Sequence, residues 1–404
     1  MSVTLRKYPY PYQAMLAICS DLDETPNKAI YFETARYLNT TEETTLGKGV
    51  GLEVGNTIYF DMPEHNFSYT NTDDDGRHKI HQLINSGHID CLHSFGDFVN
   101  NRALIEQHWN TIQSGDRKIE VWVDHAQAPT NLDNDIMQGQ GAEFGKPAYH
   151  SDLTVQSGIL AFIWKGRVTS CVAQNAKRSY RALFNKQQIK VSLKTMTLEF
   201  IKGWLARLGN TKYAMHKDNQ VLRQSTLVDG THINEFMRCN PAWGGVSCFD
   251  QARGIHHVLT KKVLDTLVDN SGCSILYSHL GKVHSVAEPF TQDTRQAFEL
   301  LAEYQQHNKI LTTTTRRLLG YNRTHESLEF AVKTVGDETY IHLTTEYEGN
   351  DLQGLTWYVE KPEHVKLYIN NSLFTGIIIN PLDCFNRTSI SIPWVSLTFP
   401  HVSE

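Results

Sequence analysis

The sequence predicts an α/β fold in which an irregular β/α barrel is followed by a small all-β sandwich. Between residue 14 and about residue 320, short apolar runs alternate with segments of helical period, as in parallel β/α units. After about residue 324, apolar and polar residues alternate and no helical period remains. At 404 residues the chain is long enough for two or three domains. We expect a barrel over residues 1–321, with a long insertion at about 126–254, and the sandwich over 322–404.

The strands expected in the barrel are short, buried runs rich in β-branched residues. They cover residues 15–20, 55–60, 89–93, 119–124, 159–164, 274–279 and 309–313. Helices are expected between them, because apolar residues recur on one helical face and stop before a glycine. Such helices end near Gly115, Gly209 and Gly272, and a further helix precedes residue 309. The helix before Gly209 carries its apolar residues at Leu198, Ile201, Leu205 and Leu208.

The strands expected in the sandwich alternate between apolar and polar residues, which is typical of strands with one buried face. They cover residues 328–332, 339–343, 365–369 and 389–395. Glycines and a proline punctuate the intervals between them, as turns require. This pattern of alternating runs and turn residues favours a separate all-β module packed against the barrel.

The composition excludes several classes of protein. Lys and Arg number 38 against 44 Asp and Glu, a net charge of −6, and no run of basic residues offers a footprint for nucleic acid or an anionic membrane. The longest apolar stretches are far below the roughly 20 residues that cross a bilayer, so we expect no membrane span. Residues 1–18 lack the apolar run of a signal peptide, and seven cysteines without a Cys-x-x-Cys pair suit reduced thiols. We expect a cytoplasmic protein.

Aspartate and histidine side chains gather where the barrel strands are expected to end. In β/α barrels the reacting groups come from these strand ends and the loops that follow. The residues are Asp21, Asp23, His93, Asp97, His125 and His279. Asp21 and Asp23 are two apart, so on an extended chain they face the same side. Asp97 lies one helical turn after His93, which would place both over one site.

Aspartate and histidine together suit Zn²⁺ or a similar divalent ion with an open position for water. Such an ion makes hydroxide available near neutral pH and polarises a carbonyl, so a carboxylate base and a histidine acid would complete a hydrolytic site. The structural alternative is that Asp23 or Thr25 caps the helix that follows Pro26. A single histidine is also more often a hydrogen-bonded structural residue than a ligand.

These residues resemble the motifs of the polysaccharide deacetylases, carbohydrate esterase family 4. The family's first motif has two aspartates at a strand end, a base and then a metal ligand, which fall on Asp21 and Asp23. Its second motif, Gly-His-Glu-Ile-x-x-His-(Ser/Thr)-x-x-His, shares its spacing with residues 87–97. Ile89-Asp90 replaces Glu-Ile there, and Asp97 replaces the final metal histidine. The resemblance spans about residues 14–320 and implies a barrel of the polysaccharide deacetylase type as the catalytic domain.

The remaining motifs match less fully. The Arg-x-Pro of the third motif is absent near His125, which the resemblance leaves as the missing imidazole ligand. The family's fifth motif, leucine-x-histidine, resembles Leu276 to His279 with one extra residue, and its histidine is the general acid. No good counterpart appears for the fourth motif, an aspartate that tunes this histidine.

The resemblance implies a metal-dependent hydrolase that removes acetyl groups from a carbohydrate. Asp21 would be the base and His279 the acid. The divalent ion, expected to be Zn²⁺, would be held by Asp23, His93, Asp97 and His125. Two alternatives stay open. One is a glycoside hydrolase on a related barrel, which uses two acidic residues and no metal. The other is a non-catalytic carbohydrate-binding protein, in which the C-terminal module holds glycan.

Overall fold

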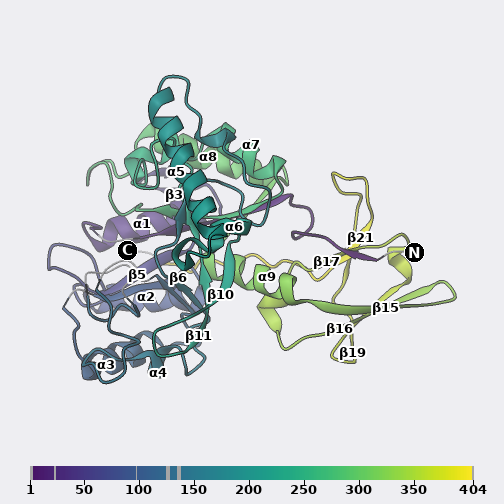
Figure 1. Cartoon of the computed structure of the whole chain (residues 1–404), viewed down its shortest axis with the longest axis horizontal. Helices are drawn as coiled ribbons and strands as arrows, with labels where there is room; N and C mark the ends of the chain where they lie inside the picture. Colours follow the sequence, from purple (N-terminus) through teal and green to yellow (C-terminus); the bar gives the residue numbers. More distant parts are fainter. Residues whose placement is uncertain (1–2, 22–23, 97, 124–127, 134–137, 403–404) are drawn as a thin grey trace.

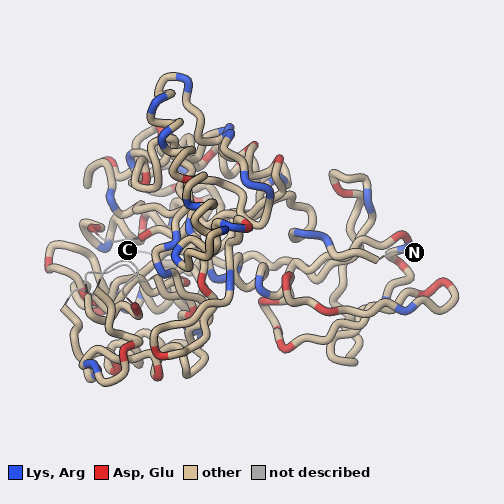
Figure 2. Tube along the Cα trace, viewed as in Figure 1, with Lys and Arg blue, Asp and Glu red and all other residues tan. Residues whose placement is uncertain are grey.

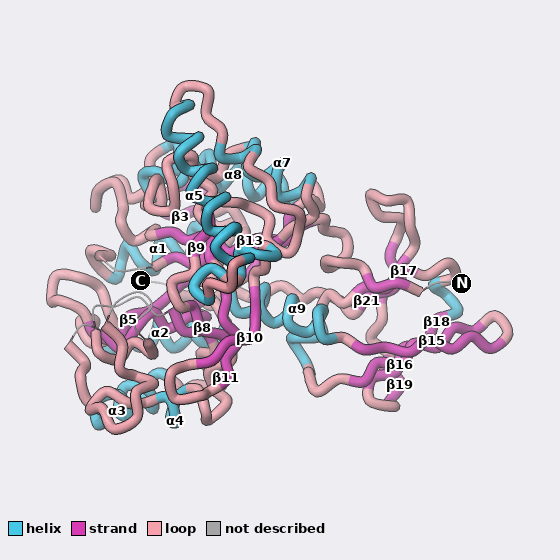
Figure 3. The backbone as a smooth tube through the Cα atoms, in the orientation of Figure 1, coloured by secondary structure: helices cyan, strands magenta, loops and turns pink. Residues whose placement is uncertain are grey.

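The computed structural model describes residues 3–21, 24–96, 98–123, 128–133 and 138–402. A larger lobe of mixed helices and strands lies beside a smaller lobe made mainly of strands (Figure 1). Figure 3 shows the strands of the larger lobe running between helices. Among the described residues, no helix combines the length and apolar composition needed to cross a bilayer. The mixed α/β class is as predicted.

Five parallel strands form one half of the main sheet. They are β2 (Ala14–Ser20), β5 (Asn56–Asp61), β6 (Ile89–Gly96), β7 (Val121–Val123) and β8 (Phe162–Trp164). Each pairs in parallel with the next. Nearly every residue in them is buried, which is why the sequence shows continuous apolar runs there rather than alternation. The strands predicted from these runs are confirmed.

The sheet curls because the chain returns from β8 to the opposite edge. β11 (His232–Phe236) pairs in parallel with β8. β12 (Arg238–Cys239) pairs in parallel with β13 (Cys273–Ser278), and β13 pairs with β2. Met237 alone separates β11 from β12 along the chain. Since β11 pairs with β8 and β12 pairs with β13, this one segment links the two sides of the sheet. The sheet is therefore curled and barrel-like.

Three further strands of the larger lobe pair with strands of this curl. They are β9 (Val168–Thr169) beside β12, β10 (Leu222–Thr226) antiparallel to β11, and β14 (Ile310–Thr313) parallel to β2. β3 (Glu43–Thr44) and β4 (Gly47–Lys48) form a separate hairpin. The stretch at 126–254, expected as an insertion, thus supplies β8 to β12 of the main sheet in its described part.

Most of the helices lie around this sheet, and several begin with a side-chain cap. The α-helices are α1 (Lys28–Asn39), α2 (Asp74–Ser86), α3 (Arg102–Ile112), α4 (Ser151–Thr154), α5 (Ile189–Arg207), α6 (Met215–Asp218), α7 (Lys261–Asp269), α8 (Gln292–Gln306) and α9 (Thr315–Ser327). Short 3₁₀ helices are η1 (Arg181–Leu183), η2 (Thr211–Tyr213), η3 (Ala252–His257), η4 (Gly349–Leu352) and η5 (Pro362–His364). Asn27, Asp73 and Asn101 each accept a hydrogen bond from a backbone N–H three residues on. The helices predicted before Gly115, Gly209 and Gly272 are confirmed as α3, α5 and α7.

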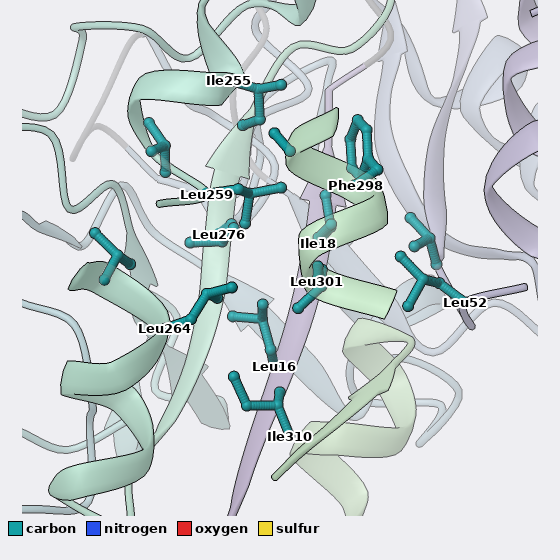
Figure 4. Close-up of a cluster of buried hydrophobic side chains, with 14 of the residues drawn as sticks. Leu16, Ile18, Leu52, Ile255, Leu259, Leu264, Leu276, Phe298, Leu301 and Ile310 are labelled. Atoms are coloured by element: carbon teal, nitrogen blue, oxygen red, sulfur yellow. The ribbon is translucent and has the colours of Figure 1, made fainter. Parts of the chain in front are cut away.

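Alternate residues of β2 serve two packing layers, because successive side chains of a strand point to opposite faces. Leu16 and Ile18 pack with Leu276 of β13 and Phe298 of α8 (Figure 4). Ala17, between them in the sequence, belongs to a second buried cluster. The central strand is therefore apolar on both faces, and its polar residue, Ser20, stands at its end.

The smaller lobe contains two four-stranded sheets. One holds β15 (Glu329–Val335), β16 (Glu338–Thr344), β18 (Val365–Ile369) and β19 (Ser372–Phe374). The other holds β1 (Thr4–Leu5), β17 (Thr356–Tyr358), β21 (Ser389–Ser391) and β20 (Ile378–Asn380). The four predicted strands are present here as β15, β16, β18 and β21. Their assembly into a sandwich, and the domain boundary at residue 321, stay predictions.

Asp90, near the start of β6, is a buried carboxyl on the main sheet. Its Oδ2 accepts a hydrogen bond of 2.8 Å from the backbone N–H of Arg316 in the first turn of α9. Burial raises the pKa of Asp90 to about 6. The same carboxyl has a pKa of about 3.9 in an unfolded chain, so the folded protein holds this proton more tightly. Its ionisation therefore destabilises the fold as the pH rises from about 4 to about 6.

The substitution Asp90→Asn should raise the free energy of unfolding by about 2–3 kcal/mol above about pH 7, because the amide keeps the acceptor and has no proton to lose. The gain should shrink to nearly nothing at about pH 3, where the aspartate is mostly protonated in both the folded and the unfolded state. Urea unfolding of both proteins at the two pH values measures it. An equal gain at both, or a loss at neutral pH, would contradict the assigned protonation.

Candidate functional site

Asp21 follows β2 directly and is fully buried where this parallel strand ends. Arg238, the first residue of β12, binds it with two hydrogen bonds. Its Nη1 donates to Oδ2 and its Nη2 to Oδ1, both at 2.9 Å. Nη2 also donates to the carbonyl of Cys19 at 2.7 Å. This two-point contact fixes the plane of the carboxylate as well as its charge.

Two aromatic side chains enclose the Arg238 guanidinium. Its Cζ lies 4.5 Å from the ring centroid of Trp164 and 4.5 Å from that of Tyr277. Trp164 is itself held by its indole N–H, which donates to the carbonyl of Arg167 at 2.8 Å. A planar, delocalised cation can stack on these rings and bind the carboxylate in its own plane, whereas an ammonium group cannot. Position 238 therefore requires arginine.

His93, in β6, brings a buried imidazole to the same carboxylate. Its Nε2 lies 3.6 Å from Oδ2 of Asp21. Tyr59 of the neighbouring strand β5 stacks on the imidazole with ring centroids 4.1 Å apart, and its hydroxyl lies 3.3 Å from Nε2. Parallel pairing of β5 with β6 places the two rings side by side. The imidazole is thus held against Asp21 by packing on its flat face.

His279, the residue after β13, brings a second imidazole. Its Nε2 lies 3.8 Å from Oδ2 of Asp21, and its Nδ1 lies 3.0 Å from Oδ2 of Asp250. The backbone N–H of His279 donates to the carbonyl of Asp250 at 2.6 Å. Asp250 comes from the loop before η3, so backbone and side chain both tie that loop to the end of β13. One imidazole nitrogen is directed at Asp21 and the other at an orienting carboxylate.

The charges around Asp21 decide its protonation. Burial by itself raises the pKa of the Asp21 carboxyl, but Arg238, and then His93 and His279, outweigh burial and hold that pKa well below its usual range. Burial likewise lowers the pKa of Arg238, but the Asp21 carboxylate more than offsets this and raises it above its ordinary value. Asp21 is therefore a permanent carboxylate at neutral pH.

Three of the six predicted site residues meet at this point, namely Asp21, His93 and His279. The other three lie outside the described residues, and they are Asp23, Asp97 and His125. Over the ranges that are described, no group of three His, Cys, Asp or Glu side chains is arranged to hold a metal ion. Only one of the four predicted ligands, His93, falls in those ranges. A buried imidazole beside a carboxylate at a strand end fits a ligand's chemistry, and the metal centre stays a prediction.

Sequence reasoning missed two residues of this site, Arg238 and Asp250. Arg238 interrupts the apolar run Phe236-Met237-Arg238-Cys239, and a lone arginine in such a run signals a buried partner. That signal was readable, although β12 is only two residues long. Asp250 follows a glycine-containing loop and carries no spacing signal. Only the fold shows that Asp250 lies beside His279.

Comparisons with protein-family models, with curated proteins and with solved structures found no match for this chain. The chemistry of the site is therefore inferred from its geometry and from the motifs in its sequence. The geometry consists of one ionised carboxylate, one arginine that fixes it, and two imidazoles directed at it. Such a set is suited to accepting a proton at one point and donating one beside it.

Proposed function

We propose that this protein is a hydrolase that removes acetyl groups from a carbohydrate, with Asp21 as the base and His279 as the acid. The observation that carries the proposal is the position of the Asp21 carboxylate between Arg238 and two imidazoles. One of these imidazoles, His279, is in turn oriented by Asp250. Pairs of this kind, with one carboxylate kept ionised and one histidine held nearby, are typical of general acid–base catalysis.

The residues of the site have distinct tasks in this reaction. Asp21 accepts a proton from the attacking water, whose oxygen forms the new bond to the acetyl carbon. His279 donates a proton to the leaving nitrogen or oxygen as its bond to that carbon breaks, and acetate is released. Arg238 keeps Asp21 ionised and oriented. Asp250 holds the His279 ring so that Nε2 faces the reaction.

The proposal includes a divalent ion, with Zn²⁺ as the expected metal. It would be held by Asp23, His93, Asp97 and His125. When bound, such an ion acidifies a water molecule and polarises a carbonyl oxygen, which helps a base as weak as Asp21. The stacking of Tyr59 on His93 fixes that ring in place, as a ligand requires.

Two features agree with a relationship to the polysaccharide deacetylases. The sheet is curled and mostly parallel, and it brings Asp21 after β2, His93 of β6 and His279 after β13 to one point, as the motifs of that family would require. Asp250 beside His279 supplies the aspartate that the fourth motif calls for and that the sequence did not reveal. These features support a divergent barrel of this type, with a catalytic carbohydrate site rather than a purely structural one.

The experiment measures acetate released from partially acetylated oligosaccharides by the wild type and by Asp21→Asn. The variant is expected to lose about two to four orders of magnitude in kcat, because its amide cannot accept the proton. Metal content by elemental analysis should be unchanged, since Asp21 is not among the proposed ligands. Asp90→Asn is the matched control, a buried aspartate outside the site, and should keep full turnover.

Three results would overturn the proposal. The first is substantial acetate release by a folded Asp21→Asn protein, which would reject the base. The second is release of reducing ends without acetate and without sensitivity to chelators, which would identify a glycoside hydrolase. The third is tight glycan binding with no turnover in the metal-loaded wild type, which would identify a binding protein.

A further inference from the structure

Helix α5 (Ile189–Arg207) has its amphipathic character inverted. Its inward face is made of small or polar residues, namely Ser192, Thr195, Glu199, Gly203 and Ala206. Its large apolar residues point to solvent instead, with Leu193 50%, Phe200 60% and Trp204 52% exposed. These three are spaced seven and four residues apart, so they form one stripe along the helix. The sequence predicted the helix, but its apolar residues do not face the core.

Polar contacts hold the inward face against the protein. Glu199 is buried and accepts hydrogen bonds from Thr169 of β9 and from Lys202, both at 2.6 Å. Thr195 donates to the carbonyl of Trp243 at 2.8 Å. These contacts fix the rotation of the helix about its axis. The exposed apolar stripe is therefore a built feature of α5 and not a consequence of the helix turning away from a core.

The charge around α5 is opposite in sign to that of the rest of the chain. Residues 177–217 contain ten Lys and Arg against one acidic residue, Glu199, a net charge of +9. The rest of the chain then carries 28 basic and 43 acidic residues, a net charge of −15. Figure 2 shows the basic positions recurring along the segment that contains α5. The net charge of the whole chain, −6, does not reveal this cluster of basic residues, because the acidic residues elsewhere outnumber them.

We propose that the outward face of α5 docks on the surface of an anionic phospholipid bilayer. A helix that presents aromatic and aliphatic side chains amid Lys and Arg lies in the plane of such a surface, with its apolar side in the headgroup region. Trp204 and Phe200 enter that region. Lys190 and Lys194, both exposed on the same side of the helix, reach the lipid phosphates with their ammonium groups. The protein rests on the membrane without crossing it.

The positive charge around α5 favours an anionic bilayer over a second copy of the chain, and the exposed apolar stripe favours it over nucleic acid. In a symmetric dimer built on α5 the two +9 segments would face each other, because an isologous interface brings the same patch of both subunits together. Nucleic acid or another anionic polymer would satisfy the lysines but would leave the apolar stripe exposed. An anionic bilayer satisfies both the charge and the apolar side chains.

Vesicle co-sedimentation of the full-length protein tests the proposal. The wild type should bind vesicles of phosphatidylcholine with phosphatidylserine far better than vesicles of phosphatidylcholine alone, and raised salt should weaken binding. The variant Phe200→Ser/Trp204→Ser and the variant Lys190→Glu/Lys194→Glu should each reduce binding at least about tenfold. All four side chains are exposed, so circular dichroism and thermal melting should match the wild type.

The matched controls are Leu373→Ser and Lys333→Glu, which change exposed residues of the smaller lobe and should bind as the wild type does. Three results would overturn the proposal. These are failure of the wild type to bind anionic vesicles, undiminished binding by both α5 variants, and a lipid-free dimer that the apolar variant dissociates. The last would assign the face to a second copy of the chain. Acetate release plays no part in this test, so it stands independently of the proposed function.

Discussion

Replacing Arg238 with methionine is expected to lower the free energy of unfolding by about 3–5 kcal/mol at neutral pH, because it leaves the buried Asp21 carboxylate uncompensated. Methionine is also unbranched and keeps the apolar stem of the side chain, so the loss of the guanidinium that lies by Trp164 and Tyr277 is the main change. Acetate release should fall with it, since the carboxylate loses its orientation. Urea unfolding and initial-rate measurements on the same samples report the two effects.

The pH dependence of this effect has a definite sign. The lowered pKa of Asp21 means that its pairing stabilises the folded state above about pH 4, the unfolded value, and that this stability is lost as the pH falls further. The gap between wild type and Arg238→Met should therefore narrow in acid. The double variant Asp21→Asn/Arg238→Met should cost about 2 kcal/mol less than the sum of the single variants. Strict additivity would show that the two side chains are not energetically coupled.

The variant His279→Gln should lower kcat for deacetylation by about two to four orders of magnitude, because glutamine has no proton to give to the leaving group. KM should change much less, since the imidazole acts on the leaving group as its bond breaks. Steady-state kinetics on a single acetylated oligosaccharide would separate the two parameters. A KM effect as large as the kcat effect would make His279 a binding residue instead.

We expect Asp250 to act through His279, and combining the two substitutions tests this. Asp250→Asn alone should lower kcat by a smaller factor than His279→Gln, because the imidazole remains but loses its orienting carboxylate. In the His279→Gln background, the same change should have almost no further effect, since its only route to the reaction is already gone. A further drop in the double variant would show that Asp250 has a separate role.

Much of the larger lobe is predictable because its strands are buried on both faces. Runs such as residues 15–20 and 159–164 are mostly apolar, and they form the buried strands β2 and β8 of the curled sheet. β12 escaped prediction because two residues of strand carry no period. The orientation of α5 escaped it for another reason. Helical period identifies an apolar face, but it does not say whether that face meets protein or solvent.

Some residues of the candidate site could likewise be predicted from the sequence, and others could not. Asp21, His93 and His279 were identified because polar residues at the ends of apolar runs stand out, and parallel strands bring such ends together. Arg238 and Asp250 are located by which strands become neighbours, and that depends on the sheet curling until β12 reaches β13. The sequence alone indicated the proposed base and the proposed acid. It could not indicate the groups that set their charge and orientation.

The separation of 217 residues between Asp21 and Arg238 has a consequence for how this protein fails on heating. Bringing such distant points together costs chain entropy that only completion of the whole curled sheet offsets. A partly unfolded molecule that opens the junction at Met237 loses its paired carboxylate in the same event. Loss of the proposed deacetylase activity on heating should therefore follow the same curve as loss of tertiary structure.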